Sequence, residues 1–137
     1  MKKLAIVLLL ASLATPALSQ EATSIDRDEH LLDGVSFTFQ NQNADAADIA
    51  FADGEVIYSW TVGRQAGNPT VTVPYKSQKI DTDIYLVGWN EPASQTFVTM
   101  VYNFKSNTSS VSVLARYGAE TPFFGFQGGV IEHVVGN

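Results

Sequence analysis

Short strand-like segments separated by turn signals constrain the fold of this chain more than any other feature. From Gly34 onward, apolar and polar residues alternate in runs rich in β-branched and aromatic residues, with turn signals about every eight to twelve residues. The predicted strands span residues 35–39, 48–52, 55–62, 70–79, 84–89, 95–104, 110–117 and 123–135. About eight antiparallel strands in sequential order are typical of an all-β, up-and-down barrel, with a β-sandwich as the alternative.

Closure into a barrel is favoured because few of these strands carry the Lys or Pro residues that protect an exposed edge. Pro74 is an exception and indicates an edge or a bulge. Residues 125–129 are rich in glycine, but no helix follows them, so we interpret them as a bulge or kink and not as a phosphate-binding loop. A barrel of about eight strands has room inside for side chains or for one small ligand.

Residues 1–19 have the features of a secretory signal peptide. Two lysines precede an apolar run from Leu4 to Leu13, and Ala17-Leu18-Ser19 forms a small-x-small cleavage site. The run is shorter than the about 20 residues of a membrane-spanning helix. We expect cleavage after Ser19 and a periplasmic or secreted bacterial protein without a membrane span, and an uncleaved anchor is the alternative.

The mature chain is expected to form one domain. Residues 20–33 are polar and charged and are predicted to form a tail or a short helix across one end of a β-barrel domain that spans residues 34–137. The sequence contains no Cys, so neither a disulfide nor a thiolate nucleophile is available and the core alone must hold the fold.

Composition and spacing argue against several classes of partner. The chain has 14 acidic and 8 basic residues, an excess that disfavours a nucleic-acid partner. His30 and His133 are the only histidines and have no metal-ligand spacing, so we expect no bound metal. No nucleotide-binding pattern is present either, and no cofactor is predicted.

Glu91 is the candidate functional residue. It is the only acidic residue between Asp83 and Glu120, and it follows Trp89 in a predicted hairpin with aromatic residues on both sides. Glu91 shares one strand face with Tyr85, Val87 and Trp89. The opposite face, with Ile84, Leu86 and Gly88, is also apolar, so the sequence leaves open which face lines the interior.

Arg116 interrupts a strand that is otherwise neutral. If Arg116 and Glu91 both point into the barrel, they could pair or flank a polar group of a ligand, since a guanidinium suits a carboxylate. The alternative for Arg116 is an ordinary surface charge, and for Glu91 it is a solvated position at a hairpin tip.

Three blocks of sequence resemble the calycin-like β-barrels that include the MoaF-like domains and the bacterial phenolic acid decarboxylases. The blocks read GVSFTFQN (34–41), IYLVGWNEP (84–92) and FFGFQGGVI (123–131). The resemblance covers residues 34–135 and implies a lipocalin-like barrel that binds a small molecule in its lumen.

The chain departs from the decarboxylases at their functional positions. The two tyrosines of their opening strand correspond to Phe37 and Phe39, and the arginine that follows a tyrosine in their third strand corresponds to Ser59, after Tyr58. Of these groups only the glutamate is kept, as Glu91. We therefore expect no phenolic acid decarboxylase activity, and the MoaF-like group is the closer fit.

The leading functional hypothesis is a small-molecule binding protein. The ligand, partly aromatic or apolar, would lie in the lumen, and the alternative is that the aromatic side chains simply fill it. The predicted ligand-binding residues are Phe37, Phe39, Tyr58, Trp60, Trp89, Glu91, Tyr102 and Arg116. A second hypothesis is a lyase or isomerase that acts on a small acid, with Glu91 as general acid or base. A third is a structural or interaction protein, which could form a homodimer that buries a strand face.

Overall fold

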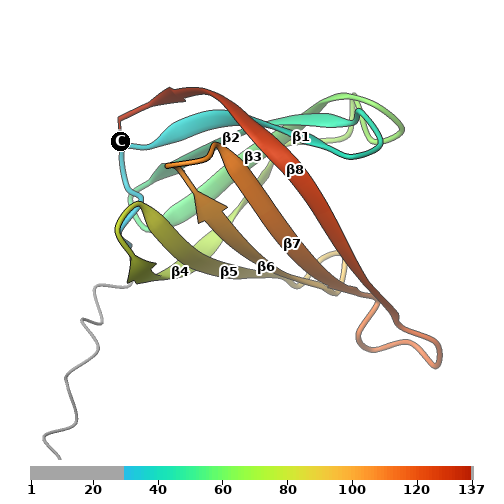
Figure 1. Cartoon of the computed structure of the whole chain (residues 1–137). Coiled ribbons are helices and arrows are strands. Elements are labelled where there is room, and N and C mark those ends of the chain that lie inside the picture. Colours follow the sequence, from blue (N-terminus) through green and yellow to red (C-terminus); the bar gives the residue numbers. More distant parts are fainter. Residues whose placement is uncertain (1–29, 137) are drawn as a thin grey trace, which may run out of the picture.

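A computed structural model of the chain describes residues 30–136. The strands in this range are β1 (Ser36–Asn41), β2 (Ala46–Ala52), β3 (Glu55–Val62), β4 (Val71–Asp81), β5 (Ile84–Glu91), β6 (Thr96–Asn103), β7 (Thr108–Ala115) and β8 (Phe123–Val135). They form one closed antiparallel barrel in sequence order, in which β8 returns to pair with β1 (Figure 1). The up-and-down barrel is confirmed, and the sandwich alternative is wrong. The predicted signal peptide lies outside the described residues, as do residues 20–29 of the predicted tail.

The strand boundaries follow the predicted pattern closely. β3 and β8 have the predicted limits, whereas β2 and β7 each begin two residues earlier than expected. One side of Pro74 is an unpaired edge, in agreement with the prediction, and no register shift occurs at this residue. It is the last β4 residue paired with β3, opposite Glu55, and the pairing with β5 begins at the next residue, Tyr75. At Pro74 the strand therefore passes from one partner to the other.

The glycine-rich segment of β8 contains no bulge, so that part of the prediction of a bulge or kink is wrong. Residues 123–130 pair with β7 in unbroken register. The irregularity of β8 lies further on, where its register with β1 shifts near His133, which has a φ of 54°. Gly129 instead provides space, because a Cβ at this position would lie 2.3 Å from the Phe39 ring and 2.4 Å from the Gln40 carbonyl oxygen.

The structure decides which face of each strand lines the interior. Side chains on a strand alternate between two faces, and in β5 the inward set is Tyr85, Val87, Trp89 and Glu91. Val87 and Trp89 are 0% and 4% exposed, whereas Leu86 on the other face is only partly buried. The question that the sequence left open for this strand is thereby answered.

One end of the barrel is closed by the turn at residues 30–34. Leu32, 1% exposed, packs into the core, and its backbone N–H donates to the Tyr75 hydroxyl at 3.1 Å. The same hydroxyl donates to Asp33 at 2.9 Å, and Asp33 also accepts from the Gly54 N–H at 3.0 Å. These bonds attach the turn to the barrel end.

Aromatic side chains fill the interior behind this turn. The ring centroids of Phe51 and Tyr75 are 4.7 Å apart, and those of Phe37 and Tyr102 are 4.9 Å apart, both in edge-to-face contact. Phe104 packs against Phe37 and Tyr102. Buried rings of this size remove about 150–250 Å² each from water, so this half of the barrel is a solid core.

The opposite end of the barrel is less tightly paired. The ladder between β3 and β4 spans only residues 55–58 and 71–74, and the ladder between β1 and β8 begins at Asn41 and Gly129. The loops at residues 63–70 and 116–122 and the turn at 92–95 lie at this end, which we call the mouth (Figure 1). None of the described residues forms a helix long and apolar enough to cross a membrane.

Candidate functional site

A cavity of about 330 Å³ occupies the half of the barrel next to the mouth. Its wall is mainly apolar and aromatic, with a few polar groups grouped around one carboxylate. The apolar and aromatic lining residues are Phe39, Ala47, Ile49, Trp60, Trp89, Val98, Met100, Val111, Val113, Ala115 and Phe123, and the polar ones are Tyr58, Gln65, Glu91, Ser94, Thr96 and Gln127. A mostly apolar pocket with a few convergent polar groups is the usual form of a small-molecule site.

Glu91 is the centre of the polar group. The Tyr58 hydroxyl donates to Oε1 of Glu91 at 2.6 Å, and Nε1 of Trp89 donates to the same oxygen at 2.8 Å. The Ser94 hydroxyl donates to Oε2 at 3.0 Å. Glu91 is only 8% exposed, and these three donors satisfy most of a carboxylate that burial would otherwise destabilise.

Local sequence explains how these groups meet. Glu91 and Trp89 are two residues apart in β5, so the period of a strand places both on the inner face. The tight turn after β5, in which the Gln95 N–H donates to the Pro92 carbonyl at 3.2 Å, directs the chain back and brings Ser94 to Glu91. Tyr58 comes from β3, two strands away, and only the closed barrel positions it.

The hydroxyl of Tyr58 is a fixed donor. Burial raises the pKa of Tyr58 far above its usual value, and the hydrogen bond and charge of Glu91 raise this pKa further. Tyr58 therefore keeps its proton at any physiological pH. Its ring contacts the Trp89 ring, with centroids 5.9 Å apart, so that the two donors to Oε1 also support one another.

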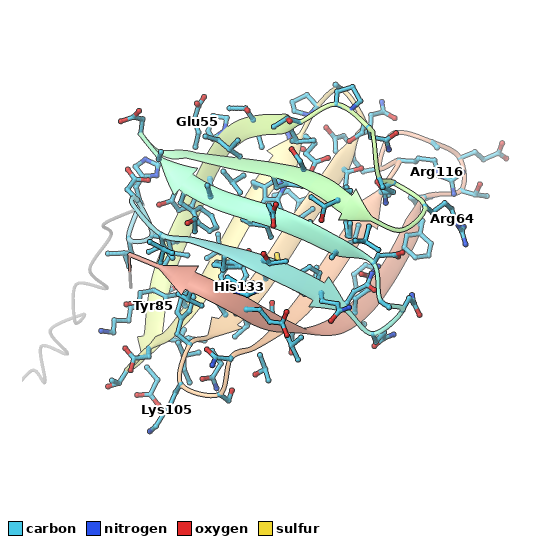
Figure 2. All side chains as sticks on the ribbon, turned by 90° about the horizontal axis from the view of Figure 1, so that it is seen from above. Glu55, Arg64, Tyr85, Lys105, Arg116 and His133 are labelled. Atoms are coloured by element: carbon cyan, nitrogen blue, oxygen red, sulfur yellow. The ribbon has the colours of Figure 1, made fainter. Side chains whose placement is uncertain are left out.

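Five of the eight predicted site residues line the cavity, namely Phe39, Tyr58, Trp60, Trp89 and Glu91. Phe37 and Tyr102 are buried in the aromatic core next to the closed end. Arg116 is exposed in the loop after β7 and does not line the cavity, so it is a surface charge. Figure 2 shows Arg116 and Arg64 in loops at the same end of the barrel.

Sequence reasoning missed several lining residues. Ser94 stands three residues after Glu91 in the turn, and this spacing could have drawn attention to it. Phe123 and Gln127 lie in the third sequence block, but only the barrel brings β8 to the cavity. Within residues 30–136, no group of three or more His, Cys, Asp or Glu side chains is placed to hold a metal ion.

The fold and the cavity define a class of protein: a small meander β-barrel that is sealed at one end and hollow at the other. A sequence model of the MoaF-like family matches residues 33–128. The chain therefore belongs to the MoaF-like family.

A crystal structure gives independent support for the fold. It is that of a protein from Burkholderia vietnamiensis provisionally described as a beta-lactamase, with a TM-score of 0.65 and 23% sequence identity over 77% of this chain and 96% of the other. At this identity the likeness concerns the fold alone. No protein with a curated description matches the chain.

Proposed function

We propose that this MoaF-like barrel is a binding protein that holds a small, partly aromatic or apolar molecule in its lumen. The observation that carries the proposal is the cavity of about 330 Å³ with the buried Glu91 carboxylate in its wall. The half of the barrel next to the closed end is packed with aromatic rings, whereas the half next to the mouth is hollow. Its volume lies within the range of small-molecule sites.

The two tryptophans of the chain provide the test, because Trp60 and Trp89 both line the cavity. We expect hydrophobic and aromatic compounds to shift their fluorescence and to raise the melting temperature increasingly as the ligand concentration rises. No response to any compound in such a screen would contradict a lumen site.

A pair of variants separates binding in the lumen from binding on the surface. Val113→Phe places a larger side chain in the cavity wall and should abolish the response. Val101→Phe, on the outer face of the neighbouring strand β6, is the matched control and should leave the response intact. Equal binding by both variants would place the ligand outside the barrel.

We also propose that the protein is exported, on the strength of the signal-like residues 1–19. Expression of the full chain in a bacterial host should yield a periplasmic or secreted protein that begins at Gln20. Terminal sequencing of the product checks this, and an intact N-terminus in the cytoplasmic fraction would contradict it.

A second candidate function is a lyase or isomerase that acts on a small acid, with Glu91 as general acid or base. The observation in its favour is the position of the Glu91 carboxylate in the cavity wall. Within residues 30–136, no Lys, Arg or His lines the cavity to hold the carboxylate of an acid substrate, so binding is the better supported function. Product formation from small unsaturated acids, lost in Glu91→Gln, would establish the enzyme.

A further inference from the structure

The hydrogen bonds of Glu91 leave one acceptor position open. A carboxylate can accept about four hydrogen bonds, two at each oxygen. Oε1 already accepts from Tyr58 and Trp89. Among the described residues, Oε2 receives the side-chain donor of Ser94 alone. A ligand in the cavity would therefore meet an acceptor at Oε2, and the group that satisfies it must be a hydrogen-bond donor.

The charge of the cavity narrows the choice of donor. In the part of the chain that the structure describes, Glu91 is the only ionisable acid or base that lines the cavity, apart from the phenol of Tyr58. The three groups bonded to Glu91 are neutral hydrogen-bond donors. The negative charge thus has no cationic partner among the described residues of the cavity wall. A low-dielectric pocket with one uncompensated negative charge attracts a cation and repels an anion.

The aromatic walls favour the same kind of ligand. Tyr58, Trp60 and Trp89 line the cavity around the carboxylate. The faces of such rings attract organic cations, most strongly where water is excluded. The apolar remainder of the wall suits a hydrocarbon or aromatic body. Arg64 and Arg116 are exposed on the loops at the mouth and do not line the cavity (Figure 2).

We propose that the cavity takes a small primary or secondary amine in its protonated form, on an apolar or aromatic body, and that its N–H group donates to Oε2 of Glu91. The proposal rests on the proposed function, because it requires that the lumen binds a small molecule at all. It adds the chemical class of that molecule.

Three probes with the same body and different head groups test the proposal: 2-phenylethylamine, 2-phenylethanol and 3-phenylpropanoate. Their affinities are measured by titration of the tryptophan fluorescence and by calorimetry. We expect the amine to bind about tenfold or more tightly than the alcohol, as a charge-assisted hydrogen bond implies, and the carboxylate to bind weakest. Equal affinities, or a preference for the alcohol or the acid, would overturn the proposal.

Two variants assign the preference to the carboxylate. Glu91→Gln keeps an acceptor for Tyr58 and Trp89 but removes the charge, and it should reduce the advantage of the amine over the alcohol by about tenfold. Ser94→Ala keeps the charge and frees a second position on Oε2, so it should preserve the preference. An unchanged preference in Glu91→Gln would overturn the role of Glu91.

The outcomes also separate this proposal from the one on which it rests. If the alcohol or the acid binds in the lumen as well as the amine does, the binding function stands and the amine class is wrong. If no probe binds and a wider screen also finds nothing, both proposals fail. The ranking of the three probes is measured on the unaltered protein, so it tests the amine class even if Glu91→Gln does not fold.

Discussion

At the scale of single residues, neutral donors organise the interior of this barrel. Tyr58 and Tyr75 use their hydroxyls to bond Glu91 and Asp33, one at each end of the lumen. Tyr102, in the aromatic core next to the closed end, is fully buried, with its hydroxyl 2.9 Å from the sulfur of Met100. Each of these three hydroxyls donates a hydrogen bond, which it can do only while the phenol keeps its proton.

The pH dependence of stability follows from this requirement. Burial raises the pKa of Tyr102 well above its usual value of about 10. Above pH 10 the tyrosine ionises in the unfolded chain but not in the folded one, so the unfolded state binds fewer protons and the free energy of unfolding falls. Above pH 10, one such tyrosine lowers the free energy of unfolding by about 1.4 kcal/mol per pH unit. Below pH 10 the tyrosine is protonated in both states, so its full contribution to the free energy of unfolding is present.

Tyr102→Phe tests this expectation. At neutral pH the variant should lose at most about 1 kcal/mol, because a thioether is a weak acceptor. Above pH 10 its stability should decline less steeply than that of the parent protein, so that the difference between the two shrinks or reverses. Urea unfolding at a series of alkaline pH values measures both slopes, and parallel slopes would contradict the assignment.

At the scale of elements, the close approach of β8 to β1 depends on one glycine. Gly129 lies opposite Asn41, next to the Phe39 ring, and Gly128 precedes it with open space around its Cα. The Cβ of an alanine at position 129 would meet backbone as well as ring atoms, whereas at position 128 the nearest atom would be 3.9 Å away.

Gly129→Ala should therefore destabilise the barrel by about 1–3 kcal/mol through overpacking. Gly128→Ala is the matched control, and it should be neutral or stabilise by about 0.4–1 kcal/mol, because alanine lowers the entropy of the unfolded chain. Chemical unfolding of both variants measures the difference, and equal effects would contradict the packing argument.

The turn that closes the barrel makes a second prediction at this scale. Leu32→Ala should lower the free energy of unfolding by about 2–5 kcal/mol, because it leaves a cavity in the core. Leu31→Ala, one residue earlier and only partly buried, should cost clearly less. Thermal or urea unfolding compares the two. Similar losses would show that the turn is not anchored by Leu32.

At the scale of the whole molecule, the mouth combines a cavity with an unpaired strand edge. Residues 123–127 of β8 pair with β7 but lie beyond the ladder with β1. Phe124 and Phe126 are 60% and 74% exposed on the outer face beside this edge, with their ring centroids 5.1 Å apart. An exposed edge next to exposed aromatic residues can pair with a second chain.

The homodimer suggested by the sequence would form through this edge, because antiparallel pairing of identical edges is self-complementary around a two-fold axis. We expect sedimentation velocity to detect a concentration-dependent dimer that Phe126→Ser weakens. Ile80→Ser, which alters an exposed residue near the closed end, is the control and should not change association. A monomer at every concentration would contradict the prediction.

Much of this architecture could be predicted from local sequence. The alternation of residues in β3 and β8 located both strands to the residue, and the turn signals indicated the order of the meander. Glu91 and Trp89 are two residues apart in β5, so both side chains point inward once the inner face of β5 is known. These are local properties, since the period of a strand and the chemistry of a turn depend on neighbours in the chain.

What the sequence determined alone was therefore a meander of about eight strands with a carboxylate beside aromatic residues. Closure of the barrel decided that Tyr58 meets Glu91 across two strands, and that Phe37 and Tyr102 fill the core while Trp60 and Trp89 line a cavity. It also left Arg116 outside. Which residues meet across strands depends on the register and on close contacts such as that of the Phe39 ring with the backbone of Gly129. These contacts form only when the chain has folded.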